Sequence, residues 1–161
     1  MPVFDTVLTD APNDADQLAI EGGLADFSAK QAGYRDWREL AVLARDPAAG
    51  QTNGGIMGRT SLGSLFVDLV YLPEALRGQA IGSRMMALVE REAARRGCRS
   101  GALITITFQA PGFCERHGWR KFGRVPCDPS GTFRVFMTKT LAVADNQSKP
   151  PCRGTSRLSC G

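Results

Sequence analysis

Residues 65–107 constrain the fold most, because they predict a strand, a helix and a second strand in succession. Residues 65–72 form a nearly continuous apolar run with β-branched and aromatic side chains, which indicates a strand covered on both faces. Residues 81–96 have the spacing of an amphipathic helix, and 101–107 form another buried-type strand. Two strands joined by a crossover helix, and so arranged in parallel, predict an α/β fold.

Further elements are predicted on both sides of this unit. We expect strands at 4–9, 39–45, 54–60, 119–125 and 132–141, and helices at 15–32 and 111–116. The stretch 142–161 is polar, contains prolines and has no hydrophobic period. It predicts a disordered tail behind a domain that spans residues 1–141.

The composition is that of a soluble globular protein. Hydrophobic residues make up 43% and charged residues 22% of the 161 positions. No apolar run approaches the roughly 20 residues that span a bilayer, and the N-terminus lacks the pattern of a signal peptide. We therefore expect a cytoplasmic protein with no membrane partner. Five scattered cysteines and a single histidine, His117, argue against a disulfide framework and predict no metal site.

The charge balance says little about partners. The net charge is +4, and about half of it comes from the tail, where Lys149, Arg153 and Arg157 oppose Asp145. No basic stripe interleaved with aromatic residues occurs in the rest of the chain. We therefore predict no nucleic-acid partner.

The loop between the strand at 65–72 and the helix at 81–96 has the chemistry of an anion site. A helix begins with backbone N–H groups that lack intrahelical partners, and phosphate oxygens can accept from them where small residues let the ligand approach. The sequence fits neither a Walker A loop nor a dinucleotide fingerprint, and an ordinary tight turn is the alternative. The residues that would surround a phosphate here are Arg77, Gly78, Gln79, Ala80, Ile81, Gly82, Ser83 and Arg84.

Two motifs at this spacing resemble the GNAT superfamily of acetyl-CoA-dependent N-acetyltransferases. The mark of that family is Arg/Gln-x-x-Gly-x-Gly/Ala directly after a strand and opening a long helix. Arg77 and Gly82 match it, while Ala80 stands where glycine is usual. Residues 108–119 are similar to the family's second segment, in which a Phe-Tyr pair precedes a Gly-aromatic pair. The resemblance extends over about residues 39–141.

The resemblance implies a fold and a cofactor site. The GNAT fold is a mixed, mostly antiparallel sheet of about seven strands flanked by helices, with a splayed parallel strand pair at the cofactor slot. The loop would hold the pyrophosphate of acetyl-CoA, and the strand before it would offer backbone groups to the pantetheine arm. The cofactor-binding residues expected on this basis are Val70, Leu72, Arg77, Gly78, Gln79, Ala80, Ile81, Gly82, Ser83 and Gln109.

The implied activity is direct transfer of an acetyl group to a primary amine of a small molecule or protein. An attacking amine must be neutral, so a carboxylate usually helps to remove its proton. Asp68 lies in an otherwise apolar strand and is the candidate base. Alternatively, Asp68 simply pairs with a backbone N–H or with an arginine such as Arg59. Trp37 and Tyr71 either line an acceptor pocket or belong to the core.

Cys114 occupies the position where the family often has a tyrosine that protonates the departing thiolate. Three alternatives follow. Cys114 acts as the acid through a bridging water; the thiolate leaves unassisted; or the protein has lost activity, which would make it a non-catalytic acyl-CoA-binding module. Separately, His117 lies on the same helical face, so a Cys–His pair is geometrically conceivable. Dimers are frequent in the family, so the resemblance also raises a homodimer, which no sequence feature shows.

Overall fold

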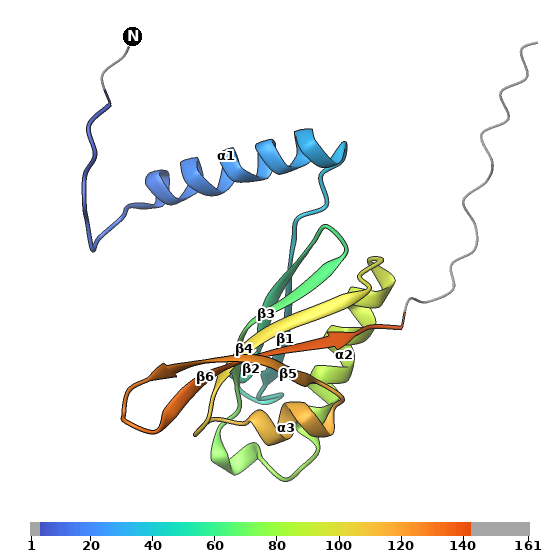
Figure 1. Cartoon of the computed structure of the whole chain (residues 1–161). Coiled ribbons are helices and arrows are strands. Elements are labelled where there is room, and N and C mark those ends of the chain that lie inside the picture. Colours follow the sequence, from blue (N-terminus) through green and yellow to red (C-terminus); the bar gives the residue numbers. More distant parts are fainter. Residues whose placement is uncertain (1–3, 143–161) are drawn as a thin grey trace, which may run out of the picture.

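Residues 4–142 are described by the computed structural model, and six strands in them form one sheet (Figure 1). The strand order is β1-β2-β3-β4-β6-β5, and only the β3–β4 pair is parallel. The strands are β1 (Arg38–Arg45), β2 (Thr52–Ser61), β3 (Ser64–Tyr71), β4 (Ser100–Ile106), β5 (Arg120–Cys127) and β6 (Thr132–Thr140). The helices are α1 (Asp14–Ala32), the 3-10 turn η1 (Glu74–Leu76), α2 (Ile81–Arg95) and α3 (Pro111–Arg116). This mixed, mostly antiparallel α/β sheet is the predicted fold class.

Helix α2 supplies one side of the hydrophobic core. Its buried residues, Met85, Met86, Val89 and Ala93, share one face of the helix. Just after the helix, Arg96 fastens it to the edge of the sheet. Its Nη1 donates to the carbonyl oxygen of Glu39 at 2.9 Å and to Oγ1 of Thr60 at 3.1 Å.

Trp119 closes the core between α2 and the sheet. Its side chain is 1% exposed, and its indole N–H donates to Oε1 of Glu90 on α2 at 3.0 Å. A Cβ atom at Gly101 of β4 would lie only 2.7 Å from the Trp119 ring. A side chain at position 101 and the buried indole therefore cannot occupy their present positions together.

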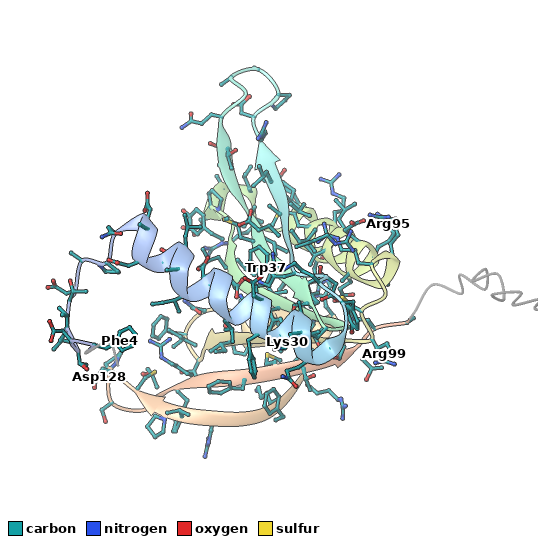
Figure 2. All side chains as sticks on the ribbon, turned by 90° about the horizontal axis from the view of Figure 1, so that it is seen from above. Phe4, Lys30, Trp37, Arg95, Arg99 and Asp128 are labelled. Atoms are coloured by element: carbon teal, nitrogen blue, oxygen red, sulfur yellow. The ribbon has the colours of Figure 1, made fainter. Side chains whose placement is uncertain are left out.

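Helix α1 lies apart from the sheet that it crosses (Figures 1 and 2). Asn13 and Asp16 form a capping box at its N-terminus, and Gly33 ends it in the left-handed conformation at φ 81°. The glycine pair 22–23 does not interrupt the helix. None of the 19 residues of α1 is buried. Tertiary packing normally supplies most of the stability of a helix, so α1 is the least supported element of the fold.

Three predictions about the fold need correction or lie outside the structure. The strand predicted at 4–9 is wrong: Phe4, Val7 and Leu8 are exposed and unpaired, so the sheet has six strands rather than about seven. The strand at 65–72 is covered on both faces only in its first half, since residues 68–71 are exposed. The predicted disordered tail lies outside the described residues from position 143 onward. No helix within residues 4–142 is long and apolar enough to cross a membrane.

The contact between Gly101 and Trp119 predicts a large effect of a small substitution. Gly101→Ala should lower the free energy of unfolding by about 1–3 kcal/mol, because the added methyl group overpacks the core. Urea unfolding measures this change. Gly23→Ala is the matched control: its Cβ meets no atom within 4 Å, and alanine in a helix should stabilise by about 0.5–1 kcal/mol. Equal midpoints for the two variants would contradict the overpacking argument.

Candidate active site

The parallel strands β3 and β4 separate halfway along their length. They pair over four positions only, from Ser64 opposite Ser100 to Val67 opposite Leu103. Both strands continue beyond this point, to Tyr71 and Ile106. The backbone edge of residues 68–71 on the β4 side therefore has no partner strand among the described residues. This confirms the splayed strand pair that the sequence resemblance implies.

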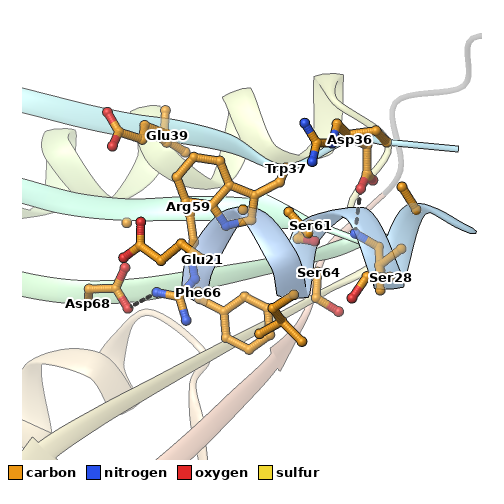
Figure 3. Close-up of a pocket in the computed structure, with 18 of the residues that line it drawn as sticks. Glu21, Ser28, Asp36, Trp37, Glu39, Arg59, Ser61, Ser64, Phe66 and Asp68 are labelled. Carbon is orange, nitrogen blue, oxygen red and sulfur yellow. Dashed lines mark hydrogen bonds and ion pairs between the residues drawn. The ribbon is translucent and has the colours of Figure 1, made fainter. Parts of the chain in front are cut away.

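A β-bulge places Asp68 at the point of separation. Met57 of β2 lies opposite Leu69 and Gly58 lies opposite Val67, so Asp68 is the extra residue in β3. Because the bulge breaks the alternation of side chains, Asp68 and Leu69 both face the same cavity. Asp68 forms an ion pair with Arg59 of β2, as one of the two alternatives from the sequence anticipates (Figure 3). Both side chains are about two-fifths exposed, at 43% and 38%.

The loop between β3 and α2 leaves the start of α2 open. Ala80 is its N-cap residue and offers no side-chain cap, so the first backbone N–H groups are available to a ligand. Gly78 and Ala80 both have positive φ, at 75° and 59°. The loop is held from within: Nε of Arg77 donates to the Leu72 carbonyl at 2.9 Å, and the Gln79 amide donates to the Ala75 carbonyl at 2.9 Å. Both side chains thus shape the loop.

Gly82 has a packing role that the sequence did not reveal. A Cβ atom there would lie 3.3 Å from two atoms of the Phe113 ring. The first turn of α2 therefore lies close to the Phe113 ring of α3. A side chain at position 82 would require the Phe113 ring to shift by a few tenths of an ångström.

A cavity of about 1000 Å³ lies between α1 and the outer face of strands β1, β2 and β3. It is bounded by α1, by the segment 34–37 and by outward side chains of the three strands. Asp68 and Leu69 contribute to its wall, so the cavity reaches the point where β3 and β4 separate. The charged and aromatic residues that line it are Glu21, Tyr34, Arg35, Asp36, Trp37, Glu39, Arg59, Phe66 and Asp68. Figure 3 labels all of them except Tyr34 and Arg35. Trp37 thus lines a cavity, whereas Tyr71 does not line this one.

Cys114, His117 and Gln109 are each engaged in contacts within the fold. The Cys114 side chain is 6% exposed and belongs to the core, and burial raises the pKa of its thiol. His117 does not pair with it, since its Nδ1 lies 2.9 Å from the carbonyl oxygen of Phe113. Oε1 of Gln109 accepts the backbone N–H of Ile106 at 3.0 Å, which closes the turn after β4.

Comparison with known proteins identifies the family, although no protein-family model matches the chain. The chain is 33% identical over 133 residues to an acetyltransferase of Agrobacterium fabrum, covering 83% of this chain and 96% of the relative. The crystal structure of an acetyltransferase from Agrobacterium tumefaciens matches with a TM-score of 0.77 at 31% identity, covering 86% of this chain and 100% of that one. The chain belongs to the GNAT superfamily of acetyltransferases.

Further similarities bear on the GNAT assignment. The chain is 36% identical over 93 residues to blasticidin-S acetyltransferase of Streptomyces morookaense, covering 57% of this chain and 68% of that enzyme. An aminoglycoside 6′-N-acetyltransferase in complex with coenzyme A shares the fold, with a TM-score of 0.54 at 17% identity over 81% of this chain and 95% of that one. The family assignment supports acetyl transfer in general, and the aminoglycoside enzyme shows the shared fold.

Sequence reasoning singled out one side of this candidate site and did not reveal much of the other. The loop and the Asp68–Arg59 pair were recognisable from local patterns. Glu21 and Glu39 were not singled out, because nothing in their local spacing links α1 to β1. Trp37 was noticed, but aromatic residues beside strands belong more often to the core, and only the cavity shows its other alternative.

Because Ala80 has a left-handed backbone, the same substitution, alanine to glycine, should change stability in opposite directions at position 80 and at position 87. Ala80→Gly should raise the free energy of unfolding by about 1 kcal/mol, since a residue with a Cβ is strained at positive φ. Ala87→Gly, an exposed site within α2, should lower it by about 1 kcal/mol. Urea unfolding of both variants and calorimetric titration with CoA measure the outcome. A destabilised Ala80→Gly variant would refute strain in the loop.

The burial of Cys114 predicts that its thiol is dispensable for turnover. Cys114→Ala should lower turnover by less than about tenfold, against the 10²–10⁴-fold typical of a general acid. CoA binding, measured by calorimetry, should stay within twofold of the parent protein because the loop is untouched. A loss of turnover of a hundredfold or more, with CoA binding intact, would establish Cys114 as the acid.

Proposed function

We propose that this protein transfers the acetyl group of acetyl-CoA to a primary amine of a small molecule by direct attack. The observation that carries the proposal is the position of Asp68. This carboxylate lies where β3 and β4 separate and also lines the large cavity beneath α1. A thioester in the slot and an amine in the cavity would therefore meet beside Asp68.

The cofactor would bind along the second half of β3 and the following loop. The pyrophosphate would accept hydrogen bonds from the open N–H groups at the start of α2, around Ile81, Gly82 and Ser83. The pantetheine arm would lie along the unpaired backbone edge of β3 near Val70 and Leu72. Arg77 would act mainly by holding the loop to Leu72, since its Nε is already engaged there.

The chemistry requires one proton acceptor at the amine. The amine nitrogen attacks the carbonyl carbon of the thioester, the C–N bond forms, and the C–S bond then breaks to release the CoA thiolate. Asp68, directly or through a water molecule, takes the proton that the amine loses. A thiolate is a tolerable leaving group, and the burial of Cys114 favours its unassisted departure among the three alternatives.

The cavity favours a small acceptor over a protein chain. Its volume of about 1000 Å³ is at the upper end of the range of roughly 300–1,000 Å³ for small-molecule sites. The similarity to blasticidin-S acetyltransferase points the same way. CoA release should therefore be measured with a panel of small amines that includes blasticidin S, and with peptides as the comparison. Turnover confined to peptides would refute the small-molecule acceptor, and CoA binding without any turnover would leave a cofactor-binding module.

Asp68→Asn tests the base. Turnover should fall by about a hundredfold or more, while the Kd for CoA should change less than twofold. Global stability should change little, because a half-exposed ion pair contributes only about 0–1 kcal/mol. Steady-state CoA release, calorimetry and urea unfolding provide the three readouts.

Asp26→Asn is the matched control for Asp68→Asn. It removes the Arg35–Asp26 ion pair, which is also exposed, but Asp26 does not line the cavity. This variant should keep its turnover within about twofold of the parent protein. Equal losses in both variants would mean that the loss in Asp68→Asn does not come from a base at the reaction point.

A further inference from the structure

The cavity beneath α1 is rich in carboxylates although the chain as a whole is basic. Four acidic side chains line it against two arginines, whereas the formal net charge of the chain is +4. Charges of one sign on the wall of a hollow attract ligands of the opposite sign. The acidic residues are Glu21, Asp36, Glu39 and Asp68, and the basic ones are Arg35 and Arg59.

Two of the four carboxylates are already engaged. Asp68 pairs with Arg59, and Oδ1 of Asp36 accepts the backbone N–H of Leu62 at 2.9 Å. Arg35 does not offset the remaining two, because it pairs with Asp26 on α1.

Glu21 and Glu39 form no ion pair within residues 4–142: Arg59 lies opposite Glu39 in the β1–β2 register, but its ion pair is with Asp68. Glu21 accepts only the neutral amide of Gln17, at 2.9 Å, among the described residues. The hydrogen bond of Glu39 that the structure shows within residues 4–142 uses its backbone carbonyl, so its carboxylate is open to a ligand. The two come from opposite walls, Glu21 from α1 and Glu39 from β1, and Figure 3 labels both among the side chains that line the cavity.

Arg59 determines where a positive charge on the ligand can lie. Its guanidinium carbon is 4.9 Å from the centre of the Phe66 ring and its Nη1 pairs with Asp68, so the cation position at the reaction point is already filled. A second cation beside it would be repelled, whereas a neutral amine would not. The attacking amine therefore brings no attractive charge to Asp68, and charge attraction must act on another part of the acceptor.

That other part has a suitable place at Trp37 and Glu39. The two side chains lie two positions apart on the chain where it enters β1, and both line the cavity. Trp37 is 46% exposed, so part of its ring is open to the cavity. An aromatic face beside a carboxylate is the combination that binds a guanidinium or ammonium group.

We propose that the acceptor is a dication: one amine, neutral when it attacks, reaches Asp68, and a second cationic group binds Glu39, Trp37 and Glu21. The inference rests on the proposed function, because only acetyl transfer makes the first amine the reacting group. The second group does not react, and it determines affinity and orientation. Glu39 is thus a specificity-determining residue of the acceptor site.

Three four-carbon probes test the proposal by calorimetric titration into the full chain saturated with CoA, which excludes turnover. They are 1,4-diaminobutane, which is a dication, butylamine, which is a monocation, and 4-aminobutanoate, which is a zwitterion. The diamine should bind about tenfold tighter than butylamine, since an exposed ion pair and a cation–π contact together contribute about that factor. Glu39→Gln should remove most of this preference, and Glu21→Gln with Glu39→Gln all of it.

Asp10→Asn is the control variant, since Asp10 is exposed and does not line the cavity. It removes the same charge and should preserve the preference for the diamine. Equal binding of diamine and butylamine to the parent protein would overturn the proposal. So would tighter binding of 4-aminobutanoate, which would make Arg59 a carboxylate receptor, or a preference that survives the double variant.

The closing measurement separates this inference from the proposed function. CoA release from acetyl-CoA is followed with the same three probes and with the amine panel. Turnover of some amine without a preference for the diamine in binding would overturn only the dication. Diamine binding that depends on Glu39, with no CoA release from any amine, would overturn only the acetyl transfer.

Discussion

The separation of β3 from β4 after Val67 and Leu103 is the constraint on which the rest of the site depends. Had the two strands stayed paired, the inner edge of residues 68–71 would have its hydrogen bonds filled and no slot would exist. The bulge at Asp68 turns the strand at the same point, and it directs two consecutive side chains toward the outer face. One strand thus brings together an open backbone edge, a carboxylate and, at its end, the loop that begins α2.

The parts of the fold that could be predicted from the sequence are those that depend on local signals. The helix predicted at 81–96 has both a periodic apolar face and an end signal at Gly97. Its observed end therefore differs from the predicted one by only one residue. The strand at 65–72 was also predicted, but its apolar residues lie in two different environments, the core and the exposed second half of the strand. Leu65 and Val67 pack in the core, whereas Leu69 and Val70 are exposed at the slot. Composition is the same in the two cases, so only tertiary structure distinguishes them.

The candidate site shows the same limit at the level of single residues. Gly82 was interpreted as clearance for a phosphate, and the structure adds a close approach to Phe113 that favours glycine whether or not a ligand binds. Gln109 is engaged by the Ile106 N–H in a turn. Glu39 attracted no attention because an exposed glutamate on an edge strand has no signature of its own. Its chemistry arises only because α1 and the outer face of the sheet enclose a common cavity.

The proposed site has a cofactor half and an acceptor half, and the two rest on very different support. The cofactor half is built on β3 and α2, whose inner side chains form the core. The acceptor half depends on α1, which buries no residue and is joined to the sheet through the segment 33–37. A ligand bound between α1 and the sheet would add contacts that α1 otherwise lacks, so ligand binding and the docking of α1 stabilise each other. Changes on α1 can therefore alter acceptor affinity while the core, the slot and the loop stay intact.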